Sequence, residues 1–360
     1  MVQVGPHGRP GYRRPPPVPG PAPGGAGGCG TLPPGTALPF GCADAAPRAR
    51  PRAGNRWFRP APLMSQLRLD PLTGRWVVIA AERLERPSAF QTRRLPVEDD
   101  PNRPCPFCPG GDEAEAPSLE VYGPDGTWQV RIVPNRYPAF SGADPMVVSH
   151  LGPVFTQAPA GGIHEVFVIT PEHEATWADL SDEQASLVMY ALRDRMAEHS
   201  SIPGLRYSQA VVNRGREAGA SIEHPHGQLM SMPFVPGETA NEMAGFARFQ
   251  GNCLLCAVAD AEEDVRHRLV AADDQVVVVS PFWSGSPYEM LIIPRHHGPH
   301  LYEATDEDLS AMGRAVRVAL RALRGRLGDV AYNLMFHSAP YRVTGVHHWH
   351  IHVVPQVTTR

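Results

Sequence analysis

The 360-residue chain contains no lysine, and all 33 of its Lys-or-Arg positions are arginines. This absence excludes chemistry that depends on a lysine amine, such as a Schiff base, a pyridoxal phosphate anchor or the lysine of a phosphate-binding loop. The formal net charge of −4 gives no basic surface of the kind that binds nucleic acid. Any phosphate group must therefore be met by arginine, backbone amides or neutral side chains.

Long apolar runs are also missing. No stretch of about 18 apolar residues occurs, so we expect no membrane-spanning helix and a cytoplasmic protein. Residues 1–63 are dominated by Pro, Gly, Ala and Arg and lack the apolar core of a signal peptide. Such a segment cannot offset the entropy of ordering, so we expect it to be disordered. Ordinary globular sequence begins at Met64, so a misplaced start codon is an alternative to a functional N-terminal tail.

Cysteine is scarce, and four of the six cysteines form two Cys-x-x-Cys pairs, Cys105 with Cys108 and Cys253 with Cys256. In a cytosolic protein such pairs indicate metal binding or redox chemistry rather than disulfide bonds. Zinc takes about four ligands, of which one Cys-x-x-Cys turn supplies two. Each pair therefore needs two further ligands from elsewhere in the chain.

The chain beyond residue 63 is a tandem repeat. Residues 222–229, Ile-Glu-His-Pro-His-Gly-Gln-Leu, have an imperfect second copy in residues 346–353, Val-His-His-Trp-His-Ile-His-Val. A Cys-x-x-Cys pair and then an apolar run followed by a histidine precede each copy. Because the same order and nearly the same spacing recur, we expect two similar structural units.

The elements predicted in each unit are strands, one long helix and a final strand that carries histidines. Ser181 and Thr305 begin capping boxes, from which we expect helices to about residues 199 and 326. Strands are predicted over residues 75–81, 207–213 and 331–337, and the first of these reads as buried. This pattern indicates an α+β fold with mostly antiparallel sheet, divided into residues 64–240 and 241–360.

The repeat also assigns ligands to the two thiol pairs. His173 and His224 are separated by nearly the same number of residues as His296 and His348. The predicted zinc sites are therefore Cys105, Cys108, His173 and His224, and Cys253, Cys256, His296 and His348. Four protein ligands leave no open position, which indicates structural sites. A competing set for the second metal is Glu242, His337, His350 and His352, although the internal repeat favours the thiolate set.

His226 is the candidate catalytic residue. Residues two apart in an extended strand share a face, which places His224, His226 and Gln228 together. A neutral imidazole attacks phosphorus well, and the resulting phosphoramidate is a good donor, so one histidine can accept and pass on a nucleotidyl group. Gln228 can donate a hydrogen bond to a phosphate oxygen without giving up a proton, which favours transfer to another phosphate over hydrolysis.

The residues around His226 fit a bound phosphate. Pro225 holds the strand extended, and Gly227 would let a phosphate approach the backbone closely. Residues 215–221, which include Gly219 and Ser221, form a small-residue loop suited to phosphate. Two further candidates are Arg83 and Arg86, because a guanidinium binds phosphate bidentately, although both could equally be solvated surface charges.

The string His-Pro-His-Gly-Gln at residues 224–228, with the first Cys-x-x-Cys pair and the Arg-x-x-Arg-Pro of residues 83–87, resembles the galactose-1-phosphate uridylyltransferase family. The resemblance runs from about Met64 to Arg360. It implies two fused histidine-triad units, a homodimer and a ping-pong reaction of galactose metabolism. His226 would attack the α-phosphorus of UDP-glucose and release glucose 1-phosphate; galactose 1-phosphate would then take the uridylyl group to give UDP-galactose.

The resemblance also implies roles for individual residues. Structural zinc would be held by the first set of four ligands, and Gln228, Asn213 and Ser221 would hold the phosphates. Asn135 would lie near the uridine, and Arg83 and Arg86 near the phosphates. Some members of the family use a glutamate and three histidines for the second metal, and others use two cysteines and two histidines. The alternatives are an ADP-sugar or dinucleoside polyphosphate phosphorylase or adenylyltransferase of the same superfamily, and a zinc-binding module without catalysis.

Overall fold

The computed structural model describes residues 65–69, 76–80, 104–124, 127–142, 145–345 and 347–357. All of them belong to one compact unit, Arg56–Arg360. The segment predicted to be disordered, residues 1–63, lies outside the described residues, as do Arg83 and Arg86.

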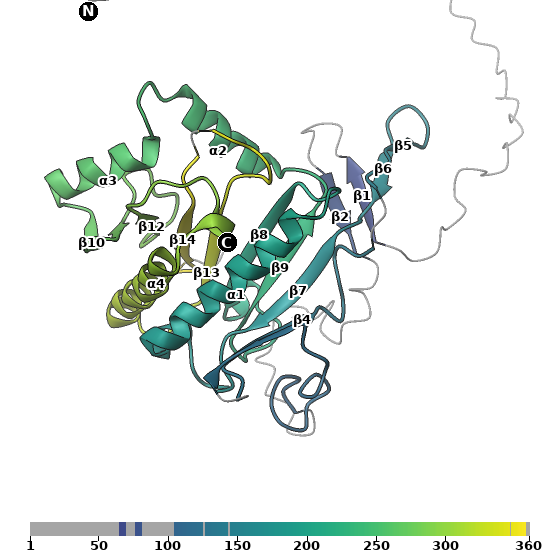
Figure 1. The fold of residues 1–360 in the computed structure, drawn as a ribbon, viewed down its shortest axis with the longest axis horizontal. Helices are drawn as coiled ribbons and strands as arrows, with labels where there is room; N and C mark the ends of the chain where they lie inside the picture. Colours follow the sequence, from purple (N-terminus) through teal and green to yellow (C-terminus); the bar gives the residue numbers. More distant parts are fainter. Residues whose placement is uncertain are drawn as a thin grey trace, which may run out of the picture. The chain divides into compact units, whose positions relative to one another are not determined.

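A ten-stranded antiparallel sheet occupies the centre of this unit, with the strand order β10-β11-β12-β14-β13-β8-β9-β7-β4-β3 (Figure 1). Its strands are β3 (Glu120–Tyr122), β4 (Val130–Pro134), β7 (Ile163–Val168), β8 (Tyr207–Arg214), β9 (His226–Met232), β10 (Leu269–Ala272), β11 (Val276–Val279), β12 (Met290–Pro294), β13 (Tyr332–His337) and β14 (His350–Pro355). Strand β8 of the first half pairs with β13 of the second, with Asn213 opposite Asn333. The two halves of the chain therefore share one continuous sheet.

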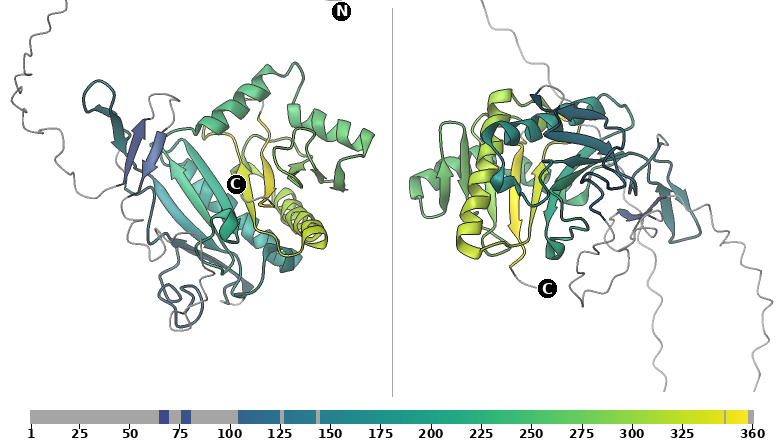
Figure 2. Two further views of the ribbon diagram at one scale, coloured as in Figure 1. Left: turned by 180° about the vertical axis from the view of Figure 1, so that it is seen from behind. Right: turned by 90° about the horizontal axis from the view of Figure 1, so that it is seen from below.

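Two long helices, α1 (Asp182–Ser200) and α4 (Asp306–Leu327), cover one face of this sheet. Both begin where their caps predict, since Ser181 accepts a hydrogen bond from the Gln184 amide and Thr305 forms a capping box. The helices approach closely at Gly313, where a Cβ would lie 2.7 Å from the carbonyl oxygen of Ala185. The left view of Figure 2, in which the molecule is seen from behind, shows the teal helix α1 on the far side of the teal strands.

The opposite face carries α2 (Gly237–Arg248) and α3 (Leu254–Val265), which pack over β11 and β12. The contact is apolar and includes Leu255 and Val277. The predicted boundary between residues 240 and 241 falls inside α2. None of the described helices is both long and apolar enough to cross a membrane.

A smaller antiparallel sheet has the order β2-β1-β6-β5. Its strands are β1 (Gln66–Leu69), β2 (Trp76–Ile79), β5 (Ser149–His150) and β6 (Thr156–Pro159). The strand predicted over residues 75–81 is present as β2, but the prediction that it is buried is wrong. Val77 is 48% exposed and Ile79 38% exposed, because the core cluster of this sheet packs against the other face of β2, which carries Trp76 and Val78.

The predicted fold class, α+β with mostly antiparallel sheet, is confirmed. Three 3-10 turns complete the described elements: η3 (Trp177–Asp179), η4 (Arg216–Ala218) and η5 (Leu301–Glu303). The loop that contains η4 joins β8 to β9, so it lies at the end of the two central strands that carry Asn213 and His226.

Candidate active site and metal clusters

The candidate catalytic residues lie on the sheet face opposite α1 and α4. Val212 and Leu229 belong to the core beneath those helices. Gln228 lies opposite Val211 of β8, and side chains alternate along a strand. Gln228, His226 and Asn213 therefore point to the other face, on two adjacent strands.

His226 begins β9 and is 9% exposed. Its Nδ1 lies 2.8 Å from the backbone carbonyl oxygen of His224. Because a carbonyl oxygen only accepts, Nδ1 must carry the proton and donate it, and in the neutral ring the lone pair is then on Nε2. The ring of Phe107 packs against the imidazole, with 5.6 Å between the ring centroids. In the predicted catalytic role of His226, Nε2 is therefore the nucleophilic atom.

The first predicted ligand set comes together. The ligand atoms of Cys105, Cys108, His173 and His224 all lie within 4.8 Å of one another. The Sγ atom of Cys108 is 3.3 Å from Nδ1 of His173 and 3.4 Å from Nδ1 of His224. Nε2 of His224 lies 2.8 Å from the carbonyl oxygen of Thr170 and donates to it, so Nδ1 presents its lone pair to the thiols.

The chemistry of this set fits zinc. Burial and the neighbouring Cys105 thiol raise the pKa of Cys108 to about 11, so the Cys108 thiol ionises at neutral pH only beside a cation. Burial lowers the pKa of His224, which keeps its ring neutral as a metal ligand requires. Two sulfur and two imidazole ligands form a donor set typical of structural zinc.

A second thiol cluster forms at the N-terminus of α3, and it corrects one predicted ligand. The grouped residues are Cys253, Cys256, His297 and His348. Both Sγ atoms lie 3.5 Å from Nδ1 of His348, and that of Cys256 lies 3.8 Å from Nδ1 of His297. His296 lies outside the cluster, because its Nδ1 is 2.9 Å from the carboxylate of Asp308 in the capping box of α4.

The competing set is present as well. His337 Nδ1 lies 2.8 Å from the Glu242 carboxylate, and Nε2 of His350 and of His352 each lie 3.9 Å from it. The second carboxylate oxygen of Glu242 is buried and finds no hydrogen-bond partner within the described part of the chain, which fits a cation. Burial, with the neighbouring His337 and His352, holds the pKa of His350 well below its usual range. The Glu242 set and the second thiol set share no residue, so the chain contains both candidate metal sites.

Gly227 has a different reason to be glycine from the one the sequence indicated. A Cβ at this position would lie 2.0 Å from Cζ of Phe167. Gly227 therefore faces the core beneath α1, away from the face that carries His226. Close packing against Phe167, and not the approach of a phosphate, accounts for the glycine.

The loop over residues 215–221 is held by the second half of the chain. Gly215 and Gly219 have φ values of 81° and 89°, a region that favours glycine. Asn333 Nδ2 donates to Oδ1 of Asn213 over 2.8 Å and to the carbonyl oxygen of Ala218 over 2.9 Å. Because Oδ1 of Asn213 is engaged, Nδ2 is the group that Asn213 can present to a phosphate. Ser221 of the same loop is exposed.

The sequence analysis missed His164, which lies between two predicted site residues. Its Nε2 is 3.0 Å from Oε1 of Gln228 and 3.1 Å from Nδ2 of Asn135. Oδ1 of Asn135 accepts a hydrogen bond from the Tyr137 amide. A buried polar pair, His164 and Glu165, at the start of an apolar strand was the signal that could have drawn attention to this position.

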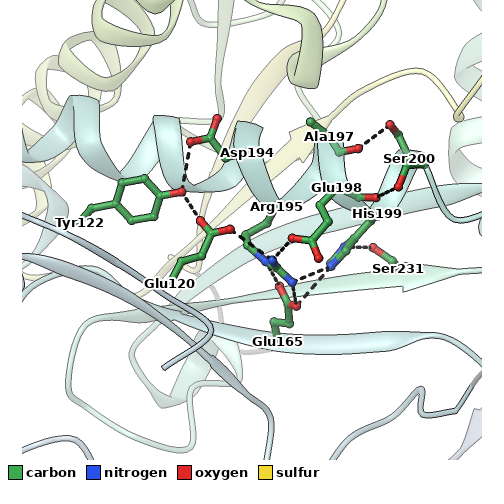
Figure 3. Close-up of polar contacts among 11 residues, drawn as sticks. Glu120, Tyr122, Glu165, Asp194, Arg195, Ala197, Glu198, His199, Ser200 and Ser231 are labelled. Carbon is green, nitrogen blue, oxygen red and sulfur yellow. Dashed lines mark hydrogen bonds and ion pairs between the residues drawn. The ribbon is translucent and has the colours of Figure 1, made fainter. Parts of the chain in front are cut away.

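Beneath the site, a buried ionic network joins β7 and β9 to α1 (Figure 3). Arg195 Nε donates to Glu165 over 3.0 Å, and His199 Nδ1 lies 2.7 Å from Oγ of Ser231. Burial alone would raise the pKa of Glu165, but hydrogen bonds from His199 and Arg195 outweigh it and lower the pKa. The charged carboxylate anchors the strands of the site from the helix side.

Comparison with known families covers nearly the whole of the described chain. Residues 59–236 match the N-terminal domain of galactose-1-phosphate uridyl transferase, and residues 239–359 match its C-terminal domain. The chain belongs to this family. Its membership confirms the resemblance that the His-Pro-His-Gly-Gln string and the first Cys-x-x-Cys pair indicated.

Within the family, relatives of two activities are about equally similar to the chain. An ADP-glucose phosphorylase from Arabidopsis thaliana is 29% identical over 309 residues, which cover 81% of this chain and 85% of the relative. A galactose-1-phosphate uridylyltransferase from Thermotoga maritima is 29% identical over 298 residues, 81% of this chain and 86% of the relative. The family assignment thus supports nucleotidyl transfer but does not decide between these two activities.

Solved structures of both activities, uridylyltransferase and ADP-glucose phosphorylase, are also similar to the chain. A uridylyltransferase superposes with a TM-score of 0.66 and 28% identity, over 81% of this chain and 86% of that one. An ADP-glucose phosphorylase from Arabidopsis thaliana, with bound ADP-glucose, superposes with a TM-score of 0.62 and 28% identity, over 82% of this chain and 91% of that one.

Proposed function

We propose that the protein transfers a nucleoside monophosphate from a nucleotide sugar to a second phosphate by a ping-pong mechanism through a covalent bond to His226. The donor is UDP-glucose and the acceptor is galactose 1-phosphate. The observation that carries the proposal is the hydrogen bond from His226 Nδ1 to the carbonyl oxygen of His224. It fixes the lone pair on Nε2, on the sheet face that Gln228 and Asn213 share.

In the first step, the lone pair of His226 Nε2 attacks the α-phosphorus of the donor. A nitrogen–phosphorus bond forms, the bond from phosphorus to the bridging oxygen breaks, and the sugar 1-phosphate leaves with the electron pair. In the second step, a phosphate oxygen of the acceptor attacks the same phosphorus, and the bond to His226 breaks. The first step replaces a phosphoanhydride bond by a phosphoramidate bond and the second step does the reverse, so no oxidant or reductant is needed.

Two neighbouring amides support this chemistry. Gln228 and Asn213 can donate hydrogen bonds to phosphate oxygens without supplying or taking a proton. Gln228 therefore cannot take a proton from an attacking water molecule. An acceptor phosphate needs no such base, because its oxygen is already negatively charged. Ser221, Gly219 and the backbone of the 215–221 loop are further candidates for phosphate contacts, as are Arg83 and Arg86 outside the described residues.

The first thiol cluster contributes to the site indirectly. Cys105, Cys108, His173 and His224 would hold zinc, which when bound supplies folding energy there. His224 then keeps a fixed position, and its backbone carbonyl oxygen keeps the ring of His226 in the reactive tautomer. The homodimer implied by the family resemblance remains a prediction that analytical ultracentrifugation would test.

A second candidate function is transfer of an adenylyl group from ADP-glucose to phosphate. The similarity to an ADP-glucose phosphorylase supports it as strongly as the similarity to the uridylyltransferases supports the first. Both activities use the same His226 chemistry and differ in the base and in the acceptor.

The experiment that tests the proposal uses UDP-glucose and ADP-glucose, each labelled in the α-phosphate. We expect wild-type protein to become labelled by UDP-glucose, and galactose 1-phosphate to remove the label. His226→Ala should not be labelled, whereas His267→Ala, which changes an exposed histidine, should be labelled like wild type. Label from ADP-glucose that phosphate removes would establish the second function instead, and no label from either donor would leave a zinc-binding protein without this activity.

A further inference from the structure

His164 is buried, and three polar groups of the described residues lie within hydrogen-bond distance of its ring. It lies on β7 with its side chain on the face that carries Gln228, because it pairs with Met230 across β7 and β9. Nδ1 accepts a hydrogen bond from the backbone amide of Ala139 over 2.9 Å. Nε2 lies 3.0 Å from Oε1 of Gln228 and 3.1 Å from Nδ2 of Asn135.

These contacts select one tautomer of the neutral ring. With the proton on Nε2, Nδ1 accepts from Ala139 and Nε2 donates to Gln228, so two of the three contacts are hydrogen bonds. With the proton on Nδ1, two donors face each other at Ala139 and two acceptors face each other at Gln228, and only the Asn135 contact is satisfied. The tautomer with Nε2–H is therefore favoured.

The tautomer determines the orientation of the Gln228 carboxamide. When Oε1 of Gln228 accepts from His164, the amide nitrogen is the end turned away from His164. The reverse orientation would place two donors together and would present a carbonyl oxygen to the charged phosphate. One hydrogen bond thus decides whether Gln228 meets the phosphate with a donor or with an acceptor.

We infer that His164 is a positioning residue for nucleotidyl transfer: it holds the carbonyl oxygen of Gln228 so that the amide nitrogen faces the phosphate attacked by His226. This inference rests on the function proposed above. The fixed contact with the Ala139 amide connects the orientation of Gln228 to the backbone that follows Asn135. His164 itself does not contact the reacting atoms.

Three substitutions separate positioning from packing. His164→Gln places an amide nitrogen near the position of Nε2 and can still donate to Gln228. His164→Asn mimics the Nδ1 side of the ring, so it can accept from Ala139 but cannot reach Gln228. His164→Phe keeps the ring volume and loses both hydrogen bonds.

The readout is the single-turnover rate at which the donor labels His226, measured with the melting temperature of each variant. We expect His164→Asn and His164→Phe to slow labelling by about tenfold or more, which corresponds to one lost hydrogen bond. His164→Gln should stay within about threefold of wild type. In a Gln228→Ala background, His164→Asn should cause no further loss, because its effect acts through Gln228.

Two results of these measurements would contradict the positioning role of His164. Equal rates for His164→Gln and His164→Asn, or losses that multiply in the Gln228→Ala background, would overturn the positioning role. If wild type is not labelled by either nucleotide sugar, the proposed function fails and this inference with it; if wild type is labelled and His164→Asn is unaffected, only this inference fails. Should the variants not fold, long-range proton–nitrogen spectra of wild-type histidine rings decide: the ring coupled to the Ala139 amide must carry its proton on Nε2.

Discussion

Asn333 donates a hydrogen bond from Nδ2 to Oδ1 of Asn213 over 2.8 Å, at the junction between β13 and β8. The second half of the chain thus orients a side chain that we place at the phosphate in the first half. Gln356 extends the series, because its Nε2 donates to Oδ1 of Asn333 over 2.9 Å. The carboxamide of Asn333 is therefore held at its oxygen by Gln356 and at its nitrogen by Asn213, and each of these bonds donates toward Asn213.

Loss of this bond should weaken catalysis more than stability. We expect Asn333→Ala to lower kcat/KM for the nucleotide sugar by about threefold to tenfold, because Asn213 can then rotate its carbonyl oxygen toward the phosphate. Gln356→Ala is the matched control, since it leaves the bond from Asn333 to Asn213 in place and should cost less. A larger loss from Gln356→Ala than from Asn333→Ala would contradict the assignment.

The first thiol cluster should be needed for stability more than for chemistry. We expect Cys105→Ser to lower Tm by about 5 °C or more, because it opens a closed metal site that contributes folding energy. Cys42→Ser, outside both Cys-x-x-Cys pairs, is the control. Metal analysis and thermal melts with and without a chelator provide the measurement, and an unchanged Tm in Cys105→Ser would count against a structural metal there.

The two remaining clusters should bind metal independently, since they share no residue. We expect Cys256→Ser to reduce the metal content without affecting the Glu242 cluster, and His352→Ala to do the reverse. Metal analysis of both variants and of the double variant distinguishes additive losses from a single shared site. Identical metal contents in all three variants would exclude independent binding.

Gly227→Ala should destabilise the fold because the new methyl group would meet the ring of Phe167. Overpacking of this kind costs about 1–3 kcal/mol, which denaturant unfolding would detect. The double variant Gly227→Ala with Phe167→Leu should recover part of the loss, since the smaller side chain makes room. No recovery, together with a normal free energy of unfolding for Phe167→Leu alone, would show that another contact requires the glycine.

Asp179 should make stability depend on acid pH. A hydrogen bond from Arg324, joined by contacts with Thr176, lowers the pKa of Asp179 from 3.8 to about 2. A carboxyl with a lowered pKa stabilises the fold fully above its ordinary pKa and loses that contribution as the pH falls through the folded value. The loss should therefore occur between about pH 4 and pH 2.

Unfolding experiments at several pH values test this directly. Asp179→Asn should flatten the dependence over that range, whereas substitution of the exposed Asp274 by asparagine should not. An unaltered slope in Asp179→Asn would mean that the link between η3 and α4 contributes nothing measurable.

Local chemistry explains why much of the fold could be predicted. Ser181 and Thr305 mark the starts of α1 and α4 because a side-chain oxygen satisfies the first unpaired amides of a helix. The repeated spacing located the first ligand set, whose four residues do meet. These signals lie within short segments or in the comparison of one half with the other.

The rest depended on contacts that the sequence does not encode locally. His296 and His297 are adjacent, and the separation of His173 from His224 recurs unchanged between His297 and His348, so a strict reading of the repeat would have selected His297. Whether β2 is buried depends on what packs against each of its two faces. Gly227 faces Phe167 only because of the register between β7 and β9, and the contact of His164 with Gln228 arises from the same pairing.

The second histidine row shows how one scaffold can serve two purposes. His350 holds its Nδ1 toward the carbonyl oxygen of His348 just as His226 does toward that of His224, yet its Nε2 lies 3.1 Å from Nε2 of His352. At the corresponding place in the first row stands Gln228, turned toward His164. We therefore expect the second histidine row to stabilise the fold rather than to react. Nε2 of His350, the counterpart of the nucleophilic atom of His226, is surrounded by His352 and Glu242. Substitutions in this row should lower the free energy of unfolding more than the rate of turnover.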